Sequence, residues 1–373
     1  MKINIIKPVL PSIDLIYEDF KECLENGLVT NNSKFVKKLE EELQIYLSSK
    51  LKPILFCNGE MALFHLIQAQ KIKMGYHHNQ TFKVLVPSVT FSGTINALYM
   101  NNLEPIFCDV DEKLIINLKK CNIDNNVKML VIVGAYGNIP SIDEVIEFSK
   151  KNNICVIFDN APAFGSTYKN KYINSFGFSE IYSLHASKNF TTMEGGLVVT
   201  EDEEIWEILQ YLRDFGQYEK TRGNIKYPGL NSKMQEISAI VGLHNLKNIE
   251  NSLIKRKKVI EKYIEFFSSD MFKPFFSLME IDKNVFCNYL YFPLILNENA
   301  ENFTNFMSKN DITVRRYYTA VHELDFYSGK FSNLDLNFTN KIKDSLVSLP
   351  LHTDMIESEI DYLFNTVKKY FNI

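Results

Sequence analysis

The fold is decided by the stretch Ser183-Leu-His-Ala-Ser-Lys188-Asn-Phe-Thr-Thr-Met-Glu-Gly195-Gly196-Leu-Val-Val-Thr200. An apolar run at 181–184 enters it and a β-branched run at 197–200 leaves it, which predicts two buried strands joined by a polar turn. Lys188 stands in that turn with Glu194 as the only other formal charge. Burial there would lower the pKa of the lysine and make its amine a nucleophile, as Schiff-base chemistry requires. The alternative is a turn lysine with its ammonium in water.

The length of the chain and its net charge limit its domain organisation and its partners. At 373 residues it exceeds what one core usually serves, and we expect a large domain at 1–244 and a smaller α+β domain at 245–373. The net charge of −4 gives no general attraction to nucleic acid or an anionic membrane. We find no signal peptide and no apolar run near the roughly 20 residues of a membrane span.

The six cysteines include no CxxC pair and no metal-ligand spacing. This pattern predicts no disulfide framework and no metal site, and a reducing cytoplasm is the compartment that we expect.

Polar residues follow a series of predicted strands between residues ~50 and ~200. The alternation of strand, polar turn and helix indicates an α/β fold with a mostly parallel central sheet between helices. Phe91, Tyr136, Asp159 and Lys188 all lie just past predicted strand ends. Ligands of such sheets bind outside the carboxyl ends of the strands, so we expect these side chains to converge.

Two strand-to-helix turns carry local signals. Asn58-Gly59 separates a short strand from an apolar helix, and the backbone N–H groups at the positive end of that helix would bind an anion. An ordinary strand-to-helix turn is the alternative. Ser141, with Glu144 three residues later, predicts a capping box at the start of another helix.

Asp159 precedes Lys188 by 29 residues and ends a β-branched strand. A buried carboxylate must be paired with a cation or strongly hydrogen-bonded. Pyridoxal phosphate (PLP) suits both residues, since the lysine forms its Schiff base and an acidic residue keeps its pyridine nitrogen protonated. A helix N-cap is the alternative role for Asp159.

At these motifs the chain resembles the DegT/StrS family of PLP-dependent aminotransferases, most of which act on nucleotide-linked keto sugars. The resemblance covers nearly the whole length and implies the type I aminotransferase fold. Six segments carry it in the family's order: Gly27-Leu-Val-Thr30-Asn31, Asn58-Gly59-Glu60-Met61-Ala62-Leu63, Pro87-Ser88-Val89-Thr90-Phe91, Asp159, residues 183–196, and Gly229-Leu-Asn231-Ser-Lys233-Met234-Gln-Glu236.

The resemblance also implies roles for residues in the cofactor site. Lys188 would form the Schiff base and move protons, Asp159 would hold the pyridine nitrogen, and Phe91 would stack on the ring. The phosphate contacts would come from Gly59, Glu60, Met61 and Ser183, and Gly195-Gly196 would let the backbone turn beside the ring. Asn231 would reach the phosphate of a neighbouring subunit, which implies a homodimer with active sites at the subunit interface.

Substrate contacts are expected from a further set: Thr30, Asn31, His185, Lys233, Arg315, Arg316, Tyr318 and His322. The two arginines could clamp a pyrophosphate. A structural role for His185 and a solvated arginine pair are the alternatives.

Two positions depart from the family pattern. Glu60 replaces a threonine of the phosphate turn, so its charge would repel phosphate unless the side chain points away. Backbone amides at 60 and 61 would then contribute more of the binding. Pro162 replaces a Gln or His that usually contacts the cofactor's O3′ side.

The segments around Lys188 and Asn231 resemble the branch that aminates C4 of a dTDP-4-keto-6-deoxyhexose, with glutamate as the amino donor in most of the family. Its products serve surface-glycan synthesis such as lipopolysaccharide or O-antigen. The alternatives are a C3 aminotransferase, a same-fold sugar 3-dehydratase, a non-catalytic regulatory member and an NAD-binding oxidoreductase. Lys188 argues against the dehydratase, which has His there, and the absence of Gly-x-Gly-x-x-Gly argues against the oxidoreductase.

Overall fold

The structure, a computed structural model, describes residues 1–217, 223–331 and 334–373. Its central sheet has seven strands, in the order β1 (Ile54–Phe56), β8 (Gly196–Val199), β7 (Ser179–Ser183), β5 (Cys155–Asp159), β4 (Val127–Val133), β2 (Lys83–Pro87) and β3 (Glu104–Cys108). Neighbours from β7 to β3 pair in parallel, and β8 runs antiparallel to both β7 and β1. The predicted mostly parallel sheet is confirmed.

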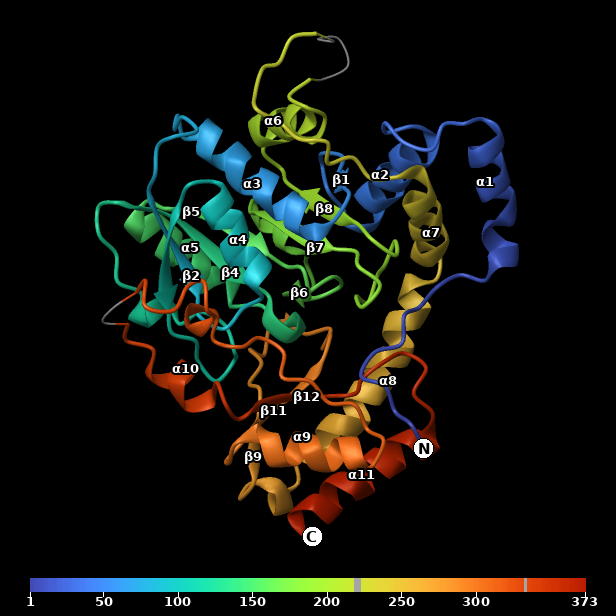
Figure 1. Cartoon of the computed structure of the whole chain (residues 1–373), viewed down its shortest axis with the longest axis vertical. Helices are drawn as coiled ribbons and strands as arrows, with labels where there is room; N and C mark the ends of the chain where they lie inside the picture. The colour runs from blue at the N-terminus through green and yellow to red at the C-terminus, as the bar shows by residue number, and fades with distance from the viewer. Residues whose placement is uncertain (218–222, 332–333) are drawn as a thin grey trace.

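Helices cover both faces of this sheet (Figure 1). Successive strand residues point to opposite faces, so Ile54 and Phe56 pack into one core and Leu55 into another. The first face carries α3 (Gly59–Lys73), α4 (Ser92–Met100) and α6 (Glu203–Arg213). The second carries α5 (Ile142–Asn152), α2 (Lys34–Tyr46) and α7 (Glu236–Leu246). The part of the chain that contains the seven-stranded sheet is therefore a three-layer α/β structure.

A second, antiparallel sheet lies in the C-terminal part of the chain. The long helix α8 (Ile249–Phe267) leads to it, and its order is β12 (Leu346–Leu349), β11 (Phe292–Leu296) and β9 (Phe276–Leu278). Figure 1 shows α9 (Ala300–Lys309) and α11 (Glu357–Phe371) beside it. Their shared core is rich in phenylalanine and also contains Ile3, which bridges to Ile312. The chain start thus packs with its C-terminal part.

Shorter elements complete the fold. Helix α1 (Ile13–Glu25) packs on α7, α10 (Asn337–Ile342) precedes β12, and β6 (Thr167–Tyr168) pairs with β10 (Val285–Phe286). We propose a domain boundary at 244 and 245, supported by the core that most of the buried residues from Val259 onward share; this core also takes in Val89, Val110 and Tyr136 of the first part. None of the helices in the described ranges combines the length and apolar character that a membrane span requires.

The predicted capping box at Ser141 is wrong. Helix α5 begins at Ile142, but the Ser141 side chain accepts no cap hydrogen bond. Its hydroxyl lies instead 3.2 Å from the phenolic oxygen of Tyr168. A tertiary partner 27 residues away therefore takes the group that the local pattern assigned to the helix.

Candidate active site

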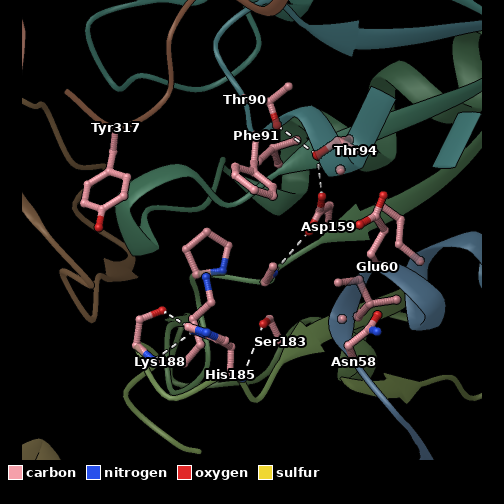
Figure 2. Close-up of a pocket in the computed structure, with 18 of the residues that line it drawn as sticks. Asn58, Glu60, Thr90, Phe91, Thr94, Asp159, Ser183, His185, Lys188 and Tyr317 are labelled. Carbon is pink, nitrogen blue, oxygen red and sulfur yellow. Dashed lines mark hydrogen bonds between the residues drawn. The ribbon is translucent and has the colours of Figure 1, made fainter. Parts of the chain in front are cut away.

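A cavity of about 660 Å³ lies at the carboxyl edge of the central sheet. The ends of β4, β5 and β7 and the segment after β2 form one side of it, and three tyrosines from the C-terminal part, Tyr291, Tyr317 and Tyr318, form another. Figure 2 shows Tyr317 across the cavity from Glu60 and Asn58. The strand-end residues Phe91, Asp159 and Lys188 converge here as predicted. Tyr136, the fourth of that set, is buried behind these three tyrosines, which we call the tyrosine wall, with its ring 4.9 Å from that of Tyr318.

Lys188 is a half-buried side chain in the turn that follows β7. Its backbone N–H donates to the carbonyl oxygen of His185 at 2.9 Å, which closes the turn. Burial lowers the pKa of Lys188 from 10.5 to about 8, against the opposing charge of Asp159. About a tenth of the amine is then neutral at pH 7, hundreds of times more than for an ordinary lysine. This lowered pKa favours the reactive amine over a fully solvated ammonium.

Asp159 is the last residue of β5 and is 5% exposed. Its Oδ2 accepts a hydrogen bond from the Thr94 hydroxyl at 2.7 Å and its Oδ1 accepts one from the Ala161 N–H at 3.2 Å. Burial raises the pKa of Asp159, while Thr94, Ala161 and Lys188 oppose that rise. No α-helix begins after it, so the N-cap alternative is wrong.

Asp159 has no ion-pair partner within the part of the chain that the structure describes. A buried carboxylate in that state favours a cation brought by a ligand, and a protonated ring nitrogen satisfies this requirement.

The turn between β1 and α3 forms a cradle at the positive end of a helix. Asn58 is the N-cap of α3, and its Oδ1 accepts from the Met61 N–H at 2.9 Å. The Met61 amide predicted to bind phosphate is thus already bonded within the protein. A Cβ on Gly59 would stand 2.8 Å from Cβ of Ser183, so this backbone lies directly against the Ser183 side chain. Helix N-termini of this kind bind phosphate.

The structure indicates a role for Gly195-Gly196 other than the predicted turn of the backbone beside the cofactor ring. A Cβ on Gly196 would stand 2.1 Å from the carbonyl oxygen of Asn58, so glycine lets β8 approach the turn between β1 and α3. Neither Gly195 nor Gly196 has a positive φ.

Phe91 is a large aromatic side chain left 66% exposed at the cavity. It stands between the end of β2 and the start of α4. An exposed ring beside a cavity suits stacking on a planar ligand. The amine, the buried carboxylate, the exposed ring and the helix N-terminus together fit PLP.

Comparison with known proteins agrees with this chemistry. Residues 13–368 match the model of the DegT/DnrJ/EryC1/StrS aminotransferase family. The chain belongs to this family. It is therefore an aminotransferase of a family that acts on nucleotide-linked sugars with PLP as cofactor.

Family relatives are similar along almost their entire length. The dTDP-4-amino-4,6-dideoxy-D-glucose transaminase of Shigella dysenteriae is 26% identical over 377 residues, with 98% of each chain covered. The GDP-perosamine synthase of Escherichia coli O157:H7 is 24% identical, with 95% of each covered. A solved structure of the E. coli GDP-4-keto-6-deoxy-D-mannose-3-dehydratase with bound hydrated PLP shares the fold, with a TM-score of 0.88 and 22% identity over 99% of this chain and all of that one.

The other predicted substrate residues divide between the cavity and its surroundings. His185 and Tyr318 line the cavity. The Nδ1 of His185 lies 2.9 Å from the Ser187 hydroxyl, and its Nε2 lies 3.6 Å from a carboxylate oxygen of Glu194. Tyr318 has a φ of +60°, a strained conformation for a bulky residue.

The remaining predicted residues lie outside the cavity of their own chain. Arg316 donates to the carbonyl oxygen of Lys343 and pairs with Asp344, while Arg315 is exposed and bridges to Ser348. His322 packs on Phe107, and Lys233 is buried in an ion pair with Asp214. Thr30, Asn31 and Asn231 are exposed. Their substrate or cofactor roles stay predictions.

Sequence reasoning missed two parts of the site. Thr94 fixes Asp159, and because its proton goes to that carboxylate, Thr90 donates in turn to Thr94 at 2.9 Å. Two threonines spaced by four residues at a helix start could have indicated this chain. Tyr291 and Tyr317 stack with ring centroids 4.2 Å apart, and no local pattern marks them.

Proposed function

We propose that this aminotransferase transfers an amino group from L-glutamate to C4 of a dTDP-linked 4-keto-6-deoxyhexose. The single observation that carries the reaction class is the Lys188 amine, whose pKa lies near 8, in one cavity with the buried Asp159. The Shigella relative is named as a transaminase of a dTDP-linked 4-amino sugar, which supports the choice of C4 and of dTDP.

PLP supplies an electron-accepting ring that carries the amino group between donor and acceptor. Lys188 would hold the cofactor through its amine, and the same amine would move a proton at the reacting carbon, for which a pKa near the operating pH is suitable. Asp159 keeps the ring nitrogen protonated, and Thr94 keeps Asp159 ionised. Ser183 and the backbone of Gly59 and Glu60 hold the phosphate.

We also infer a homodimer with shared active sites. The Glu236 carboxylate ties together the two exposed loops that carry Thr30, Asn31 and Asn231, because it accepts from the Ser33, Phe35 and Val36 N–H groups at 2.6–3.1 Å. The outer side of α1 leaves Ile13, Tyr17 and Leu24 more than half exposed. Apolar exposure of this kind favours a protein partner. In a dimer, the loops of one subunit would reach the cavity of the other subunit.

The cytoplasm is the proposed compartment. All six cysteines are free, as expected in a reducing environment.

A substrate panel tests the proposed reaction. Purified protein with PLP and glutamate would be incubated with dTDP-, UDP- and GDP-linked 4-keto-6-deoxy sugars and with a dTDP-linked 3-keto sugar. We expect amino product by mass from the dTDP 4-keto sugar first. Preference for GDP would favour the activity named for the E. coli relative, and amination of the 3-keto sugar would favour the C3 alternative. A Lys188→Ala protein that still forms product would overturn the mechanism.

A further inference from the structure

We propose that Glu60 opposes the binding of the cofactor phosphate, so that this aminotransferase holds PLP mainly through its ring and its link to Lys188. The inference rests on the proposed placement of the phosphate at the start of α3. Glu60 is the second residue of that helix and lines the cavity. A helix N-terminus carries roughly half a positive charge, so a full carboxylate charge in the first turn more than offsets it.

The Glu60 carboxylate is held at the cavity rim. The Asn96 side-chain N–H₂ donates to it at 3.5 Å, and the Tyr327 hydroxyl donates to Oδ1 of Asn96 at 2.5 Å. Its Cδ lies 3.5 Å from the Cβ position of Gly93 at the start of α4. Figure 2 shows Glu60 on the same side of the cavity as Asp159, and the charge of Glu60 contributes to the raised pKa of Asp159. The side chain is exposed at the rim, so solvent partly screens its charge, and it acts on the cavity from that position.

Nearby cations do not balance this charge. Among the described residues that line the cavity, the acidic side chains are Glu60, Asp159 and Glu194, and the basic side chains are Lys188 and His185. Lys188 would hold the cofactor through its amine, and His185 lies against Glu194. The resemblance drawn from the sequence implies a threonine at position 60, whose hydroxyl would donate to phosphate. The substitution thus replaces an attractive contact with a repulsive one.

Removal of the charge should tighten the binding of PLP but leave that of pyridoxal, which has no phosphate, almost unchanged. Unit charges about 6 Å apart in a medium of effective dielectric about 40 interact by about 1.4 kcal/mol, a roughly tenfold change in affinity. We expect Glu60→Gln and Glu60→Thr to lower the Kd of PLP about tenfold and that of pyridoxal less than about twofold. Added salt should reduce the difference.

The experiment measures Kd of both ligands by visible absorbance on cofactor-free protein. Glu60→Asp retains the charge and should bind PLP as weakly as the native chain. Glu104→Gln removes an exposed charge from β3 and should leave the Kd values of PLP and of pyridoxal unchanged. Thermal unfolding of every variant verifies the fold, and the Thr variant serves if the Gln variant unfolds.

Two results overturn the inference in distinguishable ways. If PLP links to Lys188, shown by borohydride trapping and peptide mass, but the ratio of the PLP and pyridoxal Kd values is the same in all folded variants, the role of Glu60 is refuted alone. If native protein links PLP elsewhere or not at all, the proposed cofactor placement fails and this inference fails with it.

Discussion

Replacement of Thr94 by valine tests how the site keeps Asp159 ionised. The Thr94 hydroxyl is the closer of the two donors to this carboxylate, at 2.7 Å against 3.2 Å for the Ala161 N–H. Valine has nearly the same shape without the donor. A hydrogen bond to a charged group contributes about 1.5–3 kcal/mol, so its loss should raise the pKa of Asp159 by about 1–2 units. The pKa already lies above its usual value, and at mildly acidic pH the variant would carry less carboxylate.

The assay is the Kd of PLP as a function of pH, since the acid limb of that profile reports the pKa of the free protein. We expect the limb to move upward by about 1–2 pH units in Thr94→Val. Thr90→Val is the matched control, because its hydroxyl contacts Thr94 and not the carboxylate, and a smaller shift is expected. Coincident acid limbs for native and Thr94→Val proteins of equal thermal stability would refute the reasoning.

Three further substitutions have defined outcomes. Because the pKa of Lys188 falls from 10.5 to about 8 on folding, the unfolded chain binds more protons between these values. The stability of cofactor-free protein should therefore rise over that pH window; Lys188→Met should lack this rise and be more stable at pH 7 by up to about 3 kcal/mol in urea unfolding. Gly59→Ala places a Cβ 2.8 Å from that of Ser183 and should lower stability by about 1–3 kcal/mol, seen as a lower Tm. Glu236→Gln should weaken the N–H bonds at the start of α2 and speed hydrogen exchange there, with unchanged exchange in α11 as the control.

The convergence of the site could be predicted because it follows from the sheet. Parallel strands have their carboxyl ends at one edge, so Phe91, Asp159 and Ser183 reach one cavity whenever their strands pair in parallel. The lysine turn joins them because β8 returns antiparallel to β7. Sequence periodicity identifies the strands. The rule that ligands bind outside the carboxyl ends of such strands then predicts which side chains converge.

The tyrosine wall could not be predicted in the same way. Tyr291 and Tyr317 lie more than a hundred residues beyond Lys188, and their stacking depends on how the C-terminal part packs. The Tyr136 hydroxyl donates to the carbonyl oxygen of Tyr317 at 2.6 Å, which fixes that packing. The wrong capping box at Ser141 has the same cause, since a tertiary partner outcompeted a local one.

Lys188 and Asp159 both carry an energetic penalty in the cofactor-free protein, and a bound ligand would remove it. Burial disfavours the charge on Lys188 and the charge on Asp159 alike, and the two are not close enough to form an ion pair. A ligand that takes up the neutral amine and brings a cation to the carboxylate removes both penalties at once. Part of the affinity for such a ligand is therefore stored in the cofactor-free fold, and the bound protein should be the more stable form by more than phosphate contacts alone would give. This contribution to affinity would offset the repulsion that we propose between Glu60 and the cofactor phosphate.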